Sequence, residues 1–134
     1  MGKFLFILLL TLFSTIIEAQ TFKLKALEYS SRDFDNGIWS DWSKEIKLNF
    51  LVTINFDDHK IKVFNRYNPE EFDIVRYYEI VKVEGHDVLE LEVVDSKGYD
   101  CGIKLIFSKK TDEAWVTMYV MYGNFDYMLY MEPS

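Results

Sequence analysis

The side chains that could carry acid–base or nucleophilic chemistry are few in this sequence and widely spaced. The two histidines, His59 and His86, fall in predicted turns of different hairpins, and neither accompanies a nucleophile motif such as Gly-x-Ser-x-Gly. Glu79 alternates in phase with Tyr77 and neighbouring valines, so we expect its charge to face inward and lose hydration unless a bulge turns it outward. A glycosidase needs two carboxylates that converge across a cleft, and this pattern supplies one. The protein is therefore predicted not to be an enzyme.

A turn-rich segment, residues 33–42, carries two tryptophans three positions apart. Trp39 and Trp42 could stack on sugar rings or pack over one end of a β-domain, and packing is the interpretation that we favour. Two aspartates at the start of the segment have the spacing of a calcium-binding loop, but its twelfth position is Lys44, where a bidentate glutamate is required. No metal ligand and no cofactor are predicted.

The C-terminal hairpin predicted at residues 114–131 is apolar on both faces, and Asp126 is its only charged residue. A strand that is apolar on both faces must be covered on both. We favour a covering made by the N-terminal strand or the tryptophan segment; a ligand cavity beneath the hairpin, or a surface for a partner or a second copy, are the alternatives. The candidate ligand-binding residues are Trp39, Trp42, Tyr77, Glu79, Trp115, Tyr119 and Met121.

Cys101 is the only cysteine of the chain, so no disulfide can form within it. It shares its alternation with Ile103, Leu105 and Phe107, which are expected to face a core. We therefore predict a buried thiol that packs as a small apolar group.

The elements that must position these residues are strands. From Ile46 to Phe56 every second residue is apolar, and polar residues fill most positions between them, which is typical of a half-buried strand. Short polar connectors separate further segments of the same kind. The predicted strands are residues 22–31, 46–56, one that starts at residue 61, 74–84, 88–95, 99–107, 114–122 and 125–131. About eight antiparallel strands in meander order predict an all-β fold, closed as a small calycin-like barrel, with a two-sheet sandwich as the alternative.

The first nineteen residues have the pattern of a cleaved signal peptide, with Lys3, an apolar run and a small residue, Ala19, before the expected cut. The apolar run is too short for a transmembrane anchor. We therefore expect a single all-β domain, residues 20–134, that is secreted or periplasmic. The net charge of −7 argues against nucleic acid and anionic membranes as partners.

Two short motifs carry a resemblance: Trp39-Ser-Asp-Trp42 early in the chain, and Asp95-Ser-Lys-Gly98-Tyr-Asp-Cys101 late in it. With the leader and the alternating strands, the chain resembles small exported β-proteins of Bacteroidetes. That group has no established activity, so the resemblance implies location and fold and transfers no catalytic residue. Its members often carry a second cysteine, which this chain lacks.

High aromatic content and the doubly apolar hairpin lead to the expected function. We predict a non-catalytic binding protein for an apolar small molecule or a lipid. The alternative is a protein-interaction or inhibitor module of the cell envelope that uses exposed tyrosine and tryptophan side chains. Carbohydrate binding and catalysis rank after these two.

Overall fold

The computed structural model describes residues 21–110 and 113–134, and these residues form ten strands. Eight of them make the wall of a barrel: β1 (Thr21–Asp35), β3 (Ile46–Asn55), β4 (Lys60–Val63), β5 (Glu70–Tyr77), β7 (His86–Val94), β8 (Asp100–Lys110), β9 (Glu113–Met121) and β10 (Phe125–Pro133). Two short strands lie outside the wall: β2 (Ile38–Trp39), which pairs with the end of β1, and β6 (Val81–Val83), which pairs with the start of β7.

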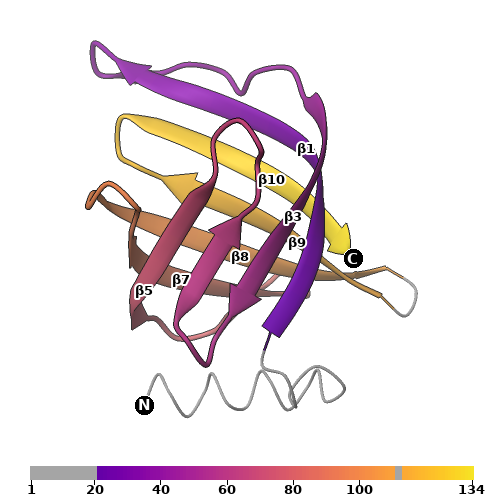
Figure 1. Cartoon of the computed structure of the whole chain (residues 1–134). Coiled ribbons are helices and arrows are strands. Elements are labelled where there is room, and N and C mark those ends of the chain that lie inside the picture. Colours follow the sequence, from indigo (N-terminus) through magenta and orange to yellow (C-terminus); the bar gives the residue numbers. More distant parts are fainter. Residues whose placement is uncertain (1–20, 111–112) are drawn as a thin grey trace.

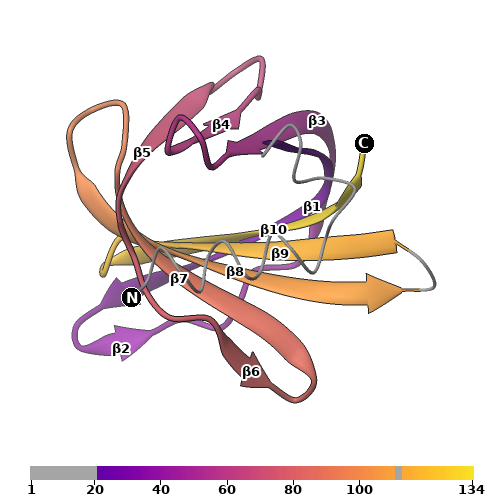
Figure 2. The ribbon, with the colours of Figure 1, turned by 90° about the horizontal axis from the view of Figure 1, so that it is seen from below.

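The wall strands follow one another in space as they do along the chain. Each pairs antiparallel with the next, and β1 pairs with β10 to close the sheet on itself (Figure 1). Viewed along the barrel, β3, β4 and β5 curve around one side and β8, β9 and β10 form the other, with β6 projecting outward (Figure 2). The predicted all-β meander barrel is confirmed, and it is a closed barrel rather than a two-sheet sandwich.

Side chains that point inward from alternate positions of the strands fill the barrel. Of the β3 residues predicted to face a core, Val52 and Ile54 are fully buried, Leu48 and Phe50 are partly buried, and Ile46, at the start of the strand, is 55 % exposed. The inward residues of β7 and β8 are buried.

Three phenylalanines, Phe22, Phe56 and Phe107, pack together at one end, with centroids of Phe22 5.6 Å from Phe56 and 6.1 Å from Phe107. Each buried aliphatic or aromatic side chain stabilises the fold by roughly 1.5–3 kcal/mol, so this closed end contributes to the stability of the barrel.

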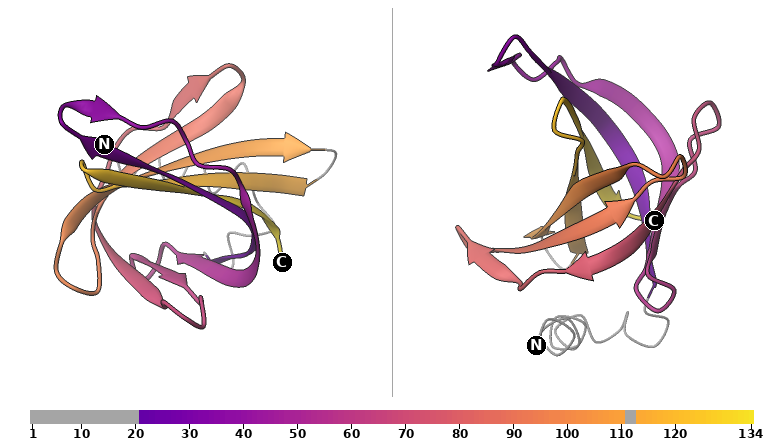
Figure 3. Two further views of the ribbon diagram at one scale, coloured as in Figure 1. Left: turned by 90° about the horizontal axis from the view of Figure 1, so that it is seen from above. Right: turned by 90° about the vertical axis from the view of Figure 1, so that its left-hand side faces the viewer.

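A bulge in β1 between Ala26 and Glu28 bends the strand. Before the bulge β1 pairs with both β3 and β10; the pairing with β3 ends at Tyr29, whereas that with β10 continues to Asp33. The rest of β1 and β2 therefore extend past the wall as a hairpin, shown in purple in Figure 3. Its turn contains Asn36 and Gly37, both at positive φ, as a two-residue hairpin turn requires.

The single strand predicted for residues 74–84 is wrong. A bulge between Ile74 and Arg76 turns Val75 outward, and the segment divides into β5 and β6. Glu79 lies between these two strands and is exposed, so the expectation that its carboxylate faces inward and loses hydration is wrong as well. The extra residue of the bulge explains why Val75 turns outward, because it shifts the alternation by one position. Glu79 is exposed for a different reason: β5 ends at Tyr77, and residues 78–80 leave the strand before β6 begins.

The predicted signal peptide, residues 1–19, and Gln20 lie outside the described residues. Within the described part of the chain, no helix has the length and hydropathy needed to cross a bilayer.

Cys101 faces the interior at the start of β8 and is buried, as predicted. Burial raises the pKa of its thiol to about 12. The thiolate, which is the reactive form, is therefore disfavoured at neutral pH.

We expect slow modification of Cys101 by a thiol reagent in the native protein and fast modification in denaturant, followed by absorbance or mass. A matched control is the double variant Tyr99→Cys, Cys101→Ala. Tyr99 is 64 % exposed and lies two residues before Cys101, in the turn that leads into β8, so a cysteine at this position should react rapidly in the native state. Equal native rates for the two proteins would contradict the interior position of Cys101.

Candidate functional site

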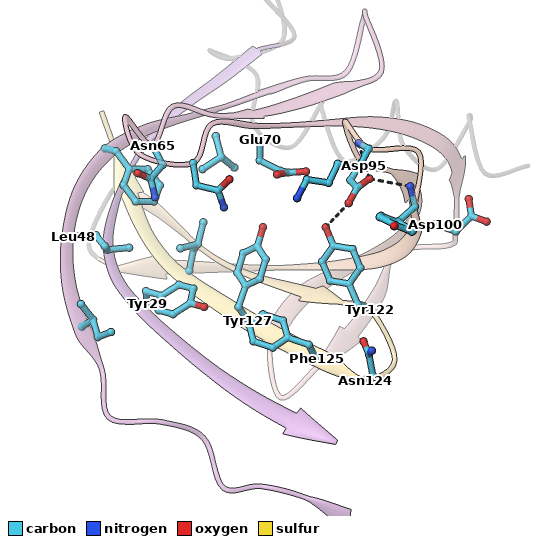
Figure 4. Close-up of a pocket in the computed structure, with 17 residues that line it drawn as sticks. Tyr29, Leu48, Asn65, Glu70, Asp95, Asp100, Tyr122, Asn124, Phe125 and Tyr127 are labelled. Atoms are coloured by element: carbon cyan, nitrogen blue, oxygen red, sulfur yellow. Dashed lines mark hydrogen bonds between the residues drawn. The ribbon is translucent and has the colours of Figure 1, made fainter. Parts of the chain in front are cut away.

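A cavity of about 790 Å³ lies at the end of the barrel opposite the phenylalanine cluster. Its walls come from β1, β3 and β10 and from the connections β4–β5, β7–β8 and β9–β10 (Figure 4). We call this end the mouth and this space the mouth cavity. Three inward side chains, Phe50, Val63 and Leu129, continue the core and line it with apolar surface.

Polar side chains also line the mouth cavity. Tyr29, Tyr122 and Tyr127 contribute rings and hydroxyl groups, and Glu70 and Asp95 contribute carboxylates. Figure 4 shows the hydroxyl of Tyr127 directed toward the side where Glu70 and Asp95 lie. The cavity thus combines an apolar interior with a small number of convergent polar groups, which is the usual composition of a small-molecule pocket.

Asp95 organises the turn between β7 and β8. Its Oδ1 accepts hydrogen bonds from the backbone N–H groups of Lys97 and Tyr99, each at 2.9 Å, and its Oδ2 accepts one from the Tyr122 hydroxyl at 2.9 Å. Gly98 has φ +88°, a conformation that glycine adopts without strain. The Asp-x-x-Gly motif is therefore a side-chain-capped turn whose carboxylate also fixes a cavity tyrosine.

These contacts set the ionisation of the mouth. Burial alone would raise the pKa of Asp95, but the donors from Tyr99, Tyr122 and Lys97 outweigh it and lower the pKa. Burial, followed by the bond to Asp95, raises the pKa of Tyr122. Burial, followed by the charge of Glu70, raises the pKa of Tyr127. The two phenols therefore stay neutral and able to donate hydrogen bonds at physiological pH.

Three of the seven residues predicted to bind a ligand come together elsewhere, on the outer wall. Arg32 donates to Asp126 Oδ2 from Nε at 3.1 Å and from Nη2 at 2.9 Å. Its guanidinium lies 4.4 Å from the ring centroid of Trp39 and 4.9 Å from that of Trp42, and the Trp42 ring lies 5.7 Å from that of Tyr119. We call these five residues the outer tryptophan cluster.

This cluster explains the doubly apolar hairpin. The tryptophan segment folds over the outer face of β9 and β10, so the covering that we favoured is found in the structure. Asp126 is 3 % exposed, and its Oδ1 is buried without a hydrogen-bond partner among the described residues. Arg32 lies against both indole rings, which makes them part of a packed cluster rather than a free platform for sugars.

The other four predicted residues are outside the cluster, and no single site brings them together. Met121 is next to it, paired in register with Asp126, and Trp115 stacks on Tyr130 at 5.4 Å.

Tyr77 lies at the closed end, where its hydroxyl shares a 2.6 Å hydrogen bond with His59 Nδ1. Burial raises its pKa to about 12. Glu79 lines a smaller groove of about 540 Å³ beside β6. Among the described residues, none of the seven lines the mouth cavity.

The sequence held partial signals for the mouth cavity. Tyr127 and Tyr29 sit on strand positions that face inward, and Asp95 belongs to a motif that the resemblance had already singled out. What the alternation did not reveal is which inward positions meet at an unfilled end. That depends on strand lengths, on the bulge in β1 and on closure of the sheet.

The arrangement defines a class: an up-and-down β-barrel with a filled end and an open, cavity-bearing end. Comparisons with family models, with curated proteins and with solved structures give no match to this chain. In the described part of the chain, no three His, Cys, Asp or Glu side chains are grouped so that they could hold a metal ion.

Replacing Asp95 by asparagine removes a charge that three donors stabilise. We expect Asp95→Asn to lower the free energy of unfolding at pH 7 by about 1 kcal/mol, measured by urea denaturation. Because the folded-state pKa of Asp95 is below its ordinary value of 3.8, its contribution is complete above about pH 4 and is lost as the pH falls through the folded-state pKa. The difference between the two proteins should therefore shrink in acid, whereas Asp57→Asn, at an exposed turn, should change little at any pH.

Removing the partner of a buried carboxylate should destabilise the outer tryptophan cluster. We expect Arg32→Met to lower the free energy of unfolding by about 2 kcal/mol, because Asp126 is then left in a buried position without its cationic partner. Adding Asp126→Asn to this variant should restore most of the loss. Lys47→Met, which breaks the solvent-exposed pair with Glu28, is the control and should have little effect. Equal effects of the two single substitutions would contradict a structural role for the cluster.

Proposed function

We propose that this protein is a non-catalytic binding protein that holds a small molecule with a large apolar part, such as a lipid, in the mouth cavity. The observation that carries the proposal is the cavity of about 790 Å³ at the open end of the barrel. Pockets that hold small ligands have volumes of about 300–1,000 Å³.

The lining supports a ligand with an apolar body. Phe50, Val63 and Leu129 form an apolar surface continuous with the core, beside the polar side chains that line the rest of the cavity. Apolar surface that a ligand removes from water contributes about 25 cal/mol per Å², while a few fixed hydroxyl and carboxylate groups orient it.

The polar groups of the mouth support binding rather than catalysis. Both oxygens of Asp95 are occupied by hydrogen bonds within the protein, and its pKa is lowered, so it is a poor proton acceptor. Tyr122 is likewise engaged with Asp95. Such groups can position a ligand without exchanging protons with it.

We infer an exported location from the leader pattern of residues 1–19 and from the resemblance to small exported β-proteins of Bacteroidetes. A ligand cavity open to the surroundings suits a protein that captures a molecule outside the cytoplasm.

A second candidate function is binding of an envelope protein. The hairpin of β1 and β2 extends past the barrel wall (Figure 3), and it carries exposed Phe34 and Ile38, of which Ile38 is 72 % exposed. Exposed apolar side chains on a projecting hairpin support a contact with another protein.

Blocking the mouth cavity tests the first proposal. The neutral dye N-phenyl-1-naphthylamine should gain fluorescence on binding the purified protein, with saturation at one molecule per chain. Leu48→Trp places a larger side chain in the cavity and should weaken binding at least tenfold. Asn49→Trp, at the neighbouring exposed position, is the matched control and should bind as the unmodified protein does.

The two candidate functions give different results. Absence of saturable dye binding, together with no thermal stabilisation by any fatty acid or lipid tested, would overturn the proposed cavity ligand. The projecting hairpin would then be the remaining candidate, because Phe34 and Ile38 are not among the residues that line the cavity.

A further inference from the structure

We propose that the ligand of the mouth cavity is an organic cation, in which an amine or quaternary ammonium group is attached to an apolar body. This inference rests on the proposed binding function and specifies the chemical class of the ligand. It is carried by three features of the cavity: unpaired carboxylates, aromatic rings that surround them, and an apolar interior.

The mouth carries more negative than positive charge. Glu70, Asp95 and Asp100 line the cavity together with a single cation, Lys97. Among the described residues, none of the three carboxylates has a lysine or arginine nitrogen within ion-pair distance. Seven other carboxylates on the strands each have such a partner: Glu28, Glu71, Asp73, Asp87, Glu90, Glu92 and Asp126. Negative charge therefore exceeds positive charge in the lining of the cavity, where Lys97 also helps to lower the pKa of Asp95.

The hydrogen bonds of these carboxylates leave their charge in place. Asp95 accepts only from neutral N–H and O–H groups. The carboxylate of Glu70 accepts from the Ser96 hydroxyl at 3.2 Å and makes no other hydrogen bond within the described residues. A carboxylate held by neutral donors keeps its full negative charge, and in a partly enclosed space that charge is weakly screened.

Aromatic rings provide the second kind of contact that an organic cation uses. Tyr29 and Tyr127 lie with centroids 5.7 Å apart, and Phe125 lies 6.3 Å from Tyr127. All three line the cavity, and so does Tyr122. The faces of such rings attract ammonium groups, more strongly where water is excluded. Rings beside carboxylates favour an alkylated ammonium over a small hydrated ion.

The raised pKa of Tyr127 is consistent with negative charge in the cavity. After burial, the charge of Glu70 is the next cause that raises the pKa of Tyr127, and Asp95 contributes in the same direction. Burial, the larger cause, disfavours a charge of either sign, whereas the contributions of Glu70 and Asp95 favour a positive charge at this place. The overall net charge of −7 also attracts cations from a distance.

Three probes with the same decyl chain test the proposal: decyltrimethylammonium, decyl maltoside and decyl sulfate, each below its micelle concentration. Their dissociation constants are measured by displacement of N-phenyl-1-naphthylamine. We expect decyltrimethylammonium to bind about tenfold or more tightly than the maltoside, with the sulfate weakest, and this preference should decrease as salt is added.

Two charge variants probe the cavity in opposite directions. Glu70→Gln should weaken decyltrimethylammonium binding about five- to tenfold, and Lys97→Gln should strengthen it by a similar factor, with decyl maltoside unchanged in both. Glu45→Gln removes the same charge at an exposed position and should change neither. A general loss of folding would weaken the binding of every probe. Opposite effects of the two substitutions on decyltrimethylammonium binding therefore distinguish a charge effect from a structural one.

The outcomes separate the two proposals. Equal affinity for the cationic and neutral probes, or tighter binding of the sulfate, would overturn the cation inference and leave the cavity function standing. Failure of the dye and of all three decyl probes to bind would overturn both. Calcium chloride is tested alone as well. If it displaces the dye or stabilises the protein as much as decyltrimethylammonium does, the inference is overturned, since the site would then take an inorganic cation.

Discussion

The pairing of β1 with β10 is the constraint on which the rest of the structure depends. It joins the first and last strands of the described chain over the register from Leu24 with Pro133 to Asp33 with Phe125. By closing the sheet it removes both free edges of the wall, and it encloses the inward side chains from all sides. Without this pairing the same strands would form an open sheet with one apolar face exposed, and no cavity could exist.

The two ends of the barrel differ because different side chains occupy the inward positions. At one end Phe22, Phe56 and Phe107 fill the space. At the other end β1 pairs with β3 only as far as Tyr29, and the capped turn at Asp95 holds the connection between β7 and β8 beside the cavity instead of across it. The polar groups of the mouth thus belong to the turns and strand ends that keep it open. The same side chains therefore contribute both to the stability of the mouth and to the chemistry of its lining.

Much of the fold could be predicted from the sequence, because the period of two along strands such as β3 is a direct consequence of burial on one face. The same rule failed between β5 and β6. The bulge after Ile74 turns Val75 outward, and Glu79 falls in the break that follows Tyr77, and no local signal in the sequence marks either. Trp39 and Trp42 were correctly favoured as packing residues, but their partner Arg32 could not be identified before the hairpin was placed in space. The mouth cavity was missed for a related reason: its lining comes from segments far apart in the sequence, and the space left between them is a property of the closed barrel.

Closure between chain ends also affects the order in which the molecule can assemble. Leu24 and Pro133 are roughly a hundred residues apart, so their pairing carries a loop-closure entropy that local hairpins do not. The hairpins β3–β4 and β8–β9 can form early from short loops, whereas the last strand must be in place before β1 has neighbours on both sides. The cavity is then the latest part of the protein to appear, and a chain that has not completed its folding has apolar strands but no binding site.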